Sequence, residues 1–235
     1  MKCFLINLDR NADRLYRVSR QLQSANVAFE RVSAVDGNAL SSTERRSAVS
    51  YFRWWCVSGC LPSPGEIGCA LSHQLVYKKI IADHLPCACV FEDDVLLGPL
   101  KTRESLVEVE NAMDTGKPQL VLLSCHVGKI KGVGLVRVNN AAYAEAYVIT
   151  RPAAELILKA NTPINCASDN WGRWAKNNGL ELYYYLPTVA TQDWREGFKS
   201  DVRDDSRKLI HKGLAWYSKR ALGKVIDGVA VKLGW

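Results

Sequence analysis

The chain has 235 residues, of which 48% are apolar and 23% are charged, a composition typical of globular proteins that excludes a disordered one. No apolar run approaches the roughly 20 residues of a membrane-spanning helix, and the apolar stretch after Met1 is too short for a signal peptide, so we expect a cytoplasmic protein. The formal net charge is +7, and most of the excess lies in residues 195–235, where ten Lys or Arg face five acids. The eight cysteines form no C-x-x-C pair, which predicts reduced, mostly buried thiols and no zinc knuckle.

The first part of the chain predicts the beginning of an α/β sheet, because apolar strands alternate with segments of helical periodicity. Ser41 or Ser42 is expected to cap a short helix, and the aromatic-rich residues 49–64 are expected to be irregular. In the helix that follows, Ile67, Leu71, Leu75 and Ile80 or Ile81 are expected on the inner face. In chain order we expect strand 2–8, helix 9–25, strand 27–32, helix 38–48, helix 67–84 and strand 87–91.

The second part continues this alternation. Asn139-Asn140 is a turn-forming pair that predicts a hairpin between two strands, and Pro152 is expected at the first position of a helix. In chain order we expect helix 100–113, strand 119–123, paired strands 135–138 and 143–150, helix 152–160, helix 168–177, and strands 182–186 and 188–191 that complete the sheet. In such a sheet the ligand lies beyond the carboxyl ends of the strands.

One apolar strand runs directly into three consecutive acids, Glu92, Asp93 and Asp94. Three adjacent carboxylates beside an apolar strand repel one another and are costly to desolvate unless a cation or a proton offsets them. In an extended chain Glu92 and Asp94 share one face, where two oxygen ligands suit a hard divalent ion shared with a substrate phosphate. The alternative is a solvated acidic turn after an edge strand, but the apolar flanks favour the metal site.

Three other groups are candidate functional residues, each with a structural alternative. Arg10 and Arg14, four residues apart at the start of a helix, provide two guanidiniums for an anion, or they pair with neighbouring acids on the helix surface. His73 precedes the acidic strand, and a single helical histidine is more often a surface or core residue than a ligand. Asp169 is either a general base toward a hydroxyl or the cap of the helix that follows it, and the pattern alone favours the cap.

Several motifs occur in order over about residues 2–192. They are Ile6-Asn7-Leu8-Asp9-Arg10 with Asp13-Arg14, Ala34-Val35-Asp36-Gly37, Gly65-Glu66-Ile67-Gly68-Cys69-Ala70-Leu71-Ser72-His73, Phe91-Glu92-Asp93-Asp94, Ala146-Tyr147-Val148-Ile149-Thr150, and Asp169 followed by Pro187 and Gln192. Together they resemble glycosyltransferase family 25, which includes bacterial lipooligosaccharide galactosyltransferases and collagen galactosyltransferases. The block from Gly65 to His73 is specific, whereas the acidic triad alone is not.

The resemblance implies a GT-A-like fold for residues 1–194, a nucleotide-sugar-binding α/β sandwich with a mixed central sheet. It also implies a DxD-like metal site, in which Asp94 first and Glu92 second would bind Mn²⁺ or Mg²⁺. The ion would bridge the two phosphates of a UDP-hexose donor and neutralise the departing diphosphate. Donor contacts are expected from Asn7, Arg10, Arg14, Asp36, Ser72, His73 and Asp93.

Members of this family invert the configuration of the sugar's anomeric carbon, so the resemblance implies a single general base. Asp169 lies in the right part of the chain for this role. Gln192 also fits the family pattern. The expected reaction moves a hexose, galactose from UDP-galactose, onto a hydroxyl of a saccharide or glycolipid acceptor such as a lipooligosaccharide or lipopolysaccharide core. Two alternatives stay open: a non-catalytic binding protein with the same fold, and a metal-dependent phosphate-handling hydrolase.

Residues 195–235 are expected to form a basic, amphipathic helical extension. Ile210, Leu214, Tyr217 and Ala221 follow one another at helical spacing, with Lys and Arg on either side of the stripe. Such a helix either lies on the anionic inner face of the cytoplasmic membrane, through residues 205–235, or packs on the domain. No nucleic-acid partner is expected.

Overall fold

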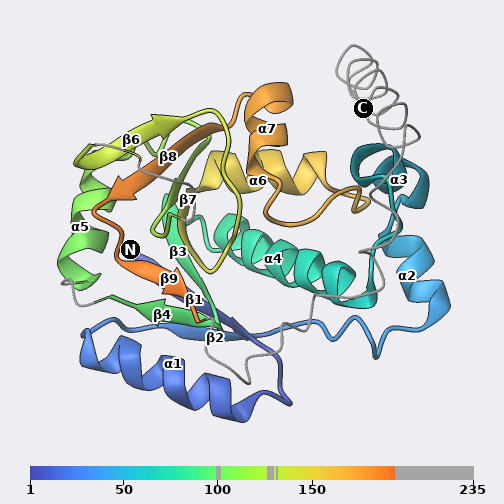
Figure 1. Ribbon diagram of the computed structural model, residues 1–235, viewed down its shortest axis with the longest axis horizontal. Coiled ribbons are helices and arrows are strands. Elements are labelled where there is room, and N and C mark those ends of the chain that lie inside the picture. The colour runs from blue at the N-terminus through green and yellow to red at the C-terminus, as the bar shows by residue number, and fades with distance from the viewer. Residues whose placement is uncertain (99–101, 126–129, 131, 194–235) are drawn as a thin grey trace.

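The computed structural model describes residues 1–98, 102–125, 130 and 132–193 (Figure 1). The strands are β1 (Lys2–Asn7), β2 (Glu30–Ser33), β3 (Cys87–Glu92), β4 (Val95–Leu97), β5 (Gln119–Leu122), β6 (Gly134–Val138), β7 (Ala146–Thr150), β8 (Glu181–Leu186) and β9 (Ala190–Gln192). The helices are α1 (Ala12–Ser24), α2 (Ser42–Ala48), α3 (Tyr51–Ser58), α4 (Pro64–Ala82), α5 (Thr102–Ala112), α6 (Arg151–Ala160) and α7 (Trp171–Asn178). The strands and helices predicted within the described residues are present in the predicted order, and α3 and β4 are additional.

The central sheet has seven strands in the order β2-β1-β3-β7-β5-β8-β6. β1 pairs in parallel with both β2 and β3, and β5 pairs in parallel with β8. β7 runs antiparallel between β3 and β5, and β6 is antiparallel to β8 at one edge. The carboxyl ends of β1, β2 and β3 therefore meet at one edge of a mixed sheet. This arrangement confirms the predicted α/β sandwich with a mixed central sheet, consistent with a GT-A-like fold.

Each face of the sheet carries its own hydrophobic core, because alternate residues of a strand point to opposite faces. In β3, Ala88 and Val90 pack with side chains of α4, α6 and α7, while Cys87, Cys89 and Phe91 pack with side chains of α1 and α5. Figure 1 shows these helices on the two sides of the sheet. Burial on both faces explains why the strand is continuously apolar until it reaches its acids.

The expectation that residues 49–64 are irregular is wrong, because α3 forms there. Trp54 is only 1% exposed and packs with Ile67 of α4 and Ile164 in a third, smaller core cluster. Gly59 ends α3 in the left-handed conformation, with φ of 72°, which glycine adopts without steric penalty. The segment has only weak helical periodicity, and burial of one large aromatic side chain stabilises the helix there.

Two strand pairings also differ from expectation. The predicted hairpin through Asn139-Asn140 is wrong: β6 pairs with β8 at the sheet edge, while β7 lies between β3 and β5. The last strand, β9, does not join the central sheet but pairs antiparallel with β4 in a separate two-stranded sheet. The strand predicted over 27–32 is shorter, because β2 begins only at Glu30 and ends at Ser33. Long-range burial, which a local turn signal does not report, decides these pairings.

Helix α4 is buried over most of its circumference, and its inner face differs from the predicted one. Ile67 and Ile80 are buried as expected, but Leu75 is 37% exposed. Ser72, His73 and Tyr77 are buried instead. Its first turn is a capping box in which Ser63 and Glu66 satisfy each other's backbone N–H groups. The helix therefore places polar side chains of its first half against the sheet.

The eight cysteines all lie within the described residues and form no disulfide, and five of them are buried, as predicted. Within the ranges that the structure describes, no helix is both long and apolar enough to cross a membrane. The predicted amphipathic extension, residues 195–235, and its membrane-contacting part, residues 205–235, lie outside the described residues, so both stay predictions.

Candidate active site

A pocket of about 320 Å³ opens at the carboxyl ends of β1, β2 and β3. Helix α4 forms one wall, and the segments that precede β7 and α7 form another. All eleven side chains predicted from the sequence line this one pocket. They are Asn7, Arg10, Arg14, Asp36, Ser72, His73, Glu92, Asp93, Asp94, Asp169 and Gln192. The structure therefore brings the predicted residues together, while their individual roles stay predictions.

Asp93 is held by the last residue of β1 and by a residue of α1. Its two carboxylate oxygens accept hydrogen bonds from Asn7 Nδ2 at 2.7 Å and from Arg14 Nη1 at 3.2 Å. Arg31 in turn donates to Asn7 Oδ1 at 3.1 Å. Because β1 and β3 are parallel neighbours, with Ile6 opposite Glu92, these groups necessarily meet at the same edge. Asp93 is thus charge-compensated by the protein itself, in contrast to its two neighbours.

Glu92 ends β3 and shares a hydrogen bond of 2.8 Å with Nε2 of the buried His73. The other ring nitrogen of His73 contacts the hydroxyl of Tyr147 at 2.7 Å, and that hydroxyl lies 3.2 Å from the hydroxyl of Tyr77. Burial, followed by the nearby charge of Glu145, raises the pKa of Glu92 to about 8, and burial lowers the pKa of His73 to about 4. At neutral pH, with no cation bound, the carboxyl is therefore protonated and the imidazole is neutral.

Asp94 is anchored on one side only. Its Oδ2 accepts a hydrogen bond of 2.6 Å from Gln192 Nε2, because β4 and β9 pair with Val95 opposite Gln192. Its Oδ1 is buried and has no hydrogen-bond partner among the described residues. Burial first, and the neighbouring Glu92 second, raise the pKa of Asp94 to about 7. A buried carboxylate oxygen without a donor is a ready ligand for a cation.

Sequence reasoning missed a fourth acid, Glu145, which is 2% exposed and lines the pocket immediately before β7. Its backbone carbonyl accepts a hydrogen bond of 2.9 Å from the N–H of Glu92, so the two residues are adjacent. Its charge contributes to the raised pKa values of both Glu92 and Asp94. The signal was present: Glu145 is an acid inside an apolar strand pattern, where an unneeded charge is costly.

Asp169 does not cap α7, so the cap alternative is wrong. Asn170 occupies the N-cap position, and the start of α7 has no side-chain cap hydrogen bond. The carboxylate of Asp169 instead accepts a bond of 3.2 Å from the backbone N–H of Tyr143, a residue with a φ of +72°. Burial raises the pKa of Asp169, which therefore lies in the pocket with increased proton affinity.

Arg10 and Ser72 have structural partners at the pocket wall. Arg10 forms an ion pair with Asp36, at the end of the turn after β2. Ser72 Oγ accepts from the N–H of Val35 at 2.9 Å and donates to Gly68 O at 2.6 Å. A Cβ on Gly68 would lie 2.5 Å from the carbonyl oxygen of Val35, so only glycine permits this close contact. The specific Gly65–His73 block thus joins α4 to the loop after β2.

One cluster among the described residues has donor atoms spaced for a metal ion. Cys69 Sγ, a ring nitrogen of His73 and a carboxylate oxygen of Glu92 all lie within 4.8 Å of one another. Glu92 therefore belongs both to this sulfur, nitrogen and oxygen cluster and to the oxygen site that the sequence predicts with Asp94.

Fold and site together define an α/β domain with an acid-lined ligand pocket at the carboxyl edge of its parallel strands. The family profile described as "Glycosyltransferase family 25 (LPS biosynthesis protein)" matches residues 1–171. The chain therefore belongs to glycosyltransferase family 25.

Individual members of this family are similar to the chain over part of their length. Procollagen galactosyltransferase 2 of Homo sapiens is 38% identical over 172 residues, and that of Mus musculus is 28% identical over 181 residues. Each match covers 67% of this chain and 27% of the relative, so the chain spans about a quarter of these proteins. A glycosyltransferase 25 family member of Aedes aegypti is 24% identical over 237 residues, covering 87% of this chain and 38% of the relative.

Some similar proteins carry names that state a lack of activity. The inactive glycosyltransferase 25 family member 3 of Homo sapiens is 36% identical over 95 residues, which cover 39% of this chain and 16% of the relative. Family membership alone therefore leaves activity to be decided by the residues of the site.

Proposed function

We propose that this chain is an active, inverting, metal-dependent glycosyltransferase that moves galactose from UDP-galactose onto a hydroxyl of a saccharide acceptor. The observation that carries the proposal is the buried acid cluster at the end of β3, in particular the unpartnered Oδ1 of Asp94. Family membership supplies the reaction class, and the procollagen galactosyltransferases among the relatives support galactose as the sugar.

Asp94 and Glu92 fit a hard divalent cation, Mn²⁺ or Mg²⁺. Carboxylate oxygens are the ligands these ions prefer, and the raised pKa values of both groups indicate that their anionic forms lack a counter-charge. When bound, the ion supplies Lewis-acid stabilisation of the departing diphosphate. Asp93, which is compensated by Asn7 and Arg14, orients the neighbouring acids and is not a ligand in this proposal.

The donor's diphosphate and nucleoside are assigned to the two arginines that lie beside the acid cluster. Arg10 and Arg14 lie at the start of α1, where two guanidiniums and the helix N-terminus attract anions. Both side chains already contact acids, Asp36 and Asp93, which fixes their positions before the donor arrives. When the donor binds, Arg10 and Arg14 exchange contacts with these acids for contacts with phosphate and ribose. Their side chains then need little rearrangement.

Asp169 is assigned as the general base. Inversion needs one group that accepts the proton of the attacking hydroxyl, on the face of the sugar opposite the diphosphate. The carboxylate is held by the N–H of Tyr143, and burial raises its pKa, which brings its proton affinity closer to what a base requires.

For the acceptor we propose a lipooligosaccharide or lipopolysaccharide core, in keeping with the description of the family as LPS biosynthesis proteins. A procollagen acceptor is the second candidate, because the named relatives act on procollagen. The proposed cytoplasmic or membrane-peripheral location depends on this choice.

The second candidate function is that of a non-catalytic family member, favoured by the similarity to inactive relatives. A panel of UDP-sugars, screened by thermal shift with and without Mn²⁺, separates the two. We expect UDP-galactose to raise the melting temperature only when Mn²⁺ is present, and Asp94→Ala to abolish that rise, while Asp83→Asn, an exposed acid outside the pocket, retains it. Metal-independent stabilisation by UDP-sugars in the unsubstituted protein would favour the non-catalytic binder.

A further inference from the structure

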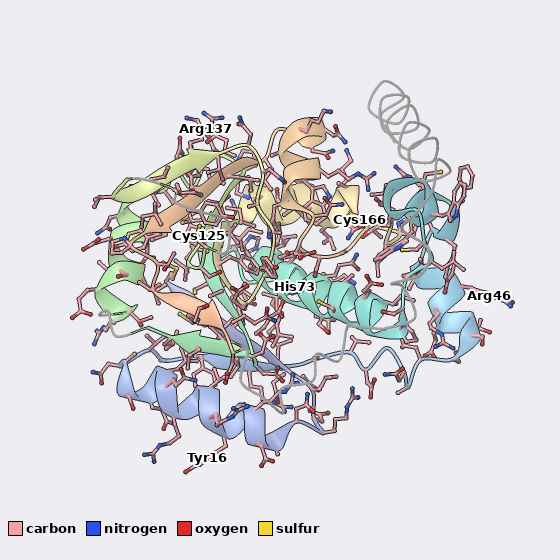
Figure 2. The ribbon with its side chains drawn as sticks, in the orientation of Figure 1. Tyr16, Arg46, His73, Cys125, Arg137 and Cys166 are labelled. Atoms are coloured by element: carbon pink, nitrogen blue, oxygen red, sulfur yellow. The ribbon has the colours of Figure 1, made fainter. Side chains whose placement is uncertain are left out.

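Cys69, His73 and Glu92 form a compact group that the proposed transfer reaction does not use as a unit. Cys69 and His73 are four residues apart on α4 and therefore lie on one face of that helix. Glu92 reaches the same point from the end of β3, and the three donor atoms lie within 4.8 Å of one another. Figure 2 shows His73 near the centre of the molecule, where α4 meets the sheet.

Two residues outside the group hold its side chains in place. The hydroxyl of Tyr147 lies 2.7 Å from Nδ1 of His73, and the two rings stack with their centroids 5.7 Å apart. Ser168 Oγ lies 3.1 Å from the sulfur of Cys69. Metal-binding histidines characteristically use the second ring nitrogen for such a bond, which fixes the ring and the tautomer. The ring thus presents Nε2 to Glu92.

We propose that Cys69, His73 and Glu92 form a zinc-class cation site, which shares Glu92 with the oxygen site proposed at Asp94. A thiolate, an imidazole and a carboxylate suit Zn²⁺ rather than Mg²⁺ or Mn²⁺, and three protein ligands would leave a fourth tetrahedral position open. With ordinary zinc bond lengths, tetrahedral ligands lie about 3.3–3.6 Å apart. Nε2 of His73 and Oε1 of Glu92, which share a hydrogen bond, are 2.8 Å apart, so these two donor atoms must separate by about 0.5 Å when zinc replaces the proton.

Binding replaces two protons by one cation. Zn²⁺ takes the place of the proton between Nε2 of His73 and the Glu92 carboxyl, and of the thiol proton of Cys69. Both protons leave to solvent, and bonds form from zinc to sulfur, nitrogen and oxygen. Two anionic ligands then balance the charge of the ion inside a buried group, which favours occupancy.

A consequence for catalysis rests on the proposed function. Glu92 belongs to both ligand sets, so zinc at this site withdraws it from the oxygen ligands that hold Mn²⁺ or Mg²⁺. The two cations therefore compete, and zinc opposes metal-dependent transfer. Zinc binding itself does not depend on the proposed reaction and can be tested alone.

The test uses the full chain with Co²⁺ as a spectroscopic substitute for Zn²⁺. We expect thiolate-to-cobalt charge-transfer absorption that saturates at one Co²⁺ per chain and disappears on addition of one equivalent of Zn²⁺. Cys69→Ser removes the absorption, while the matched control Cys60→Ser, a half-buried cysteine outside the pocket, keeps it. Tyr147→Phe keeps the absorption but weakens zinc affinity 10- to 100-fold, the usual effect of removing a partner of a histidine ligand.

Absence of the band in the unsubstituted protein, or its persistence in Cys69→Ser, overturns the zinc site. Far-ultraviolet circular dichroism of each variant ensures that a lost band is not a lost fold. Asp94→Asn separates this proposal from the proposed function: it is expected to lose Mn²⁺ binding, measured by electron paramagnetic resonance, and to keep the cobalt band. Joint loss of both signals in a folded Asp94→Asn protein would contradict two separate sites.

Discussion

The most informative perturbation is Asp94→Asn, because it is expected to stabilise the metal-free protein while it abolishes metal binding. The carboxyl of Asp94 has its ordinary pKa of 3.8 in the unfolded chain and a pKa of about 7 in the folded protein, owing to burial and then to Glu92. At about 1.4 kcal/mol for each pKa unit, ionisation in the folded state costs about 4 kcal/mol. Asparagine keeps the shape and removes that cost.

The direction of the pH dependence of the unfolding free energy follows from the difference in pKa between the folded and unfolded states. The unfolded chain releases the Asp94 proton near pH 4 and the folded protein near pH 7, so the metal-free wild type loses stability between these values and no further above them. The difference in unfolding free energy between variant and wild type should therefore be near zero at pH 4 and approach about 4 kcal/mol at pH 8.

Urea denaturation at pH 4, 6 and 8, in chelator and in Mn²⁺, measures both effects. We expect Mn²⁺ at pH 8 to stabilise the wild type and to leave Asp94→Asn unchanged. Asp83→Asn, at an exposed position, is the control and should follow the wild type throughout. If the metal-free variant is no more stable than the wild type at pH 8, the buried charge at Asp94 is refuted. Equal stabilisation of both proteins by Mn²⁺ would remove Asp94 from the metal site.

Three further predictions concern other residues of the pocket. Asp169→Asn should keep donor binding by calorimetry and lower the transfer rate 10²- to 10⁴-fold, as expected for a lost base; unimpaired transfer would rule out that role. Burial chiefly raises the pKa of Glu92 and Glu145 raises it next, so Glu145→Gln should lower it from about 8 in a ¹³C carboxyl titration, and an unchanged value would show that this charge does not act there. Gly68→Ala should destabilise the protein by about 1–3 kcal/mol, because its Cβ would overlap Val35 O, whereas Gly98→Ala, with 3.5 Å of space, should change stability little; equal effects would contradict the close contact.

The sequence predicts most of the site because its residues lie at the ends of parallel strands. Glu92 and Asn7 follow apolar runs that any α/β sheet would bury, so their meeting at the carboxyl edge is a consequence of topology. Asp169 is different: pattern favoured a helix cap, and only the contact with Tyr143 shows that its carboxylate lies in the pocket. Long-range contacts of this kind cannot be predicted from the spacing of residues in the sequence.

The parts that the sequence does not predict depend on tertiary burial. The prolines and aromatic residues of 49–64 suggest an irregular segment, but part of it is helical. Burial of Trp54 stabilises this helix by more than the local sequence preference destabilises it. The apolar neighbours of Glu145 predict a strand at this position, but they do not predict that its carboxylate is buried beside Glu92. In β9, pairing with β4 brings Gln192 to Asp94, a contact that requires two short strands distant in sequence to meet.

We propose above that the acid cluster at the end of β3 supports metal-dependent sugar transfer. The most direct measurement is the initial rate of galactose transfer from UDP-galactose to a lipooligosaccharide core acceptor, titrated with Mn²⁺ after removal of all metal. We expect no transfer in chelator, a saturable rise with Mn²⁺, and no rise for Asp94→Asn. A full rate in chelator, or full restoration of Asp94→Asn by saturating Mn²⁺, would contradict it.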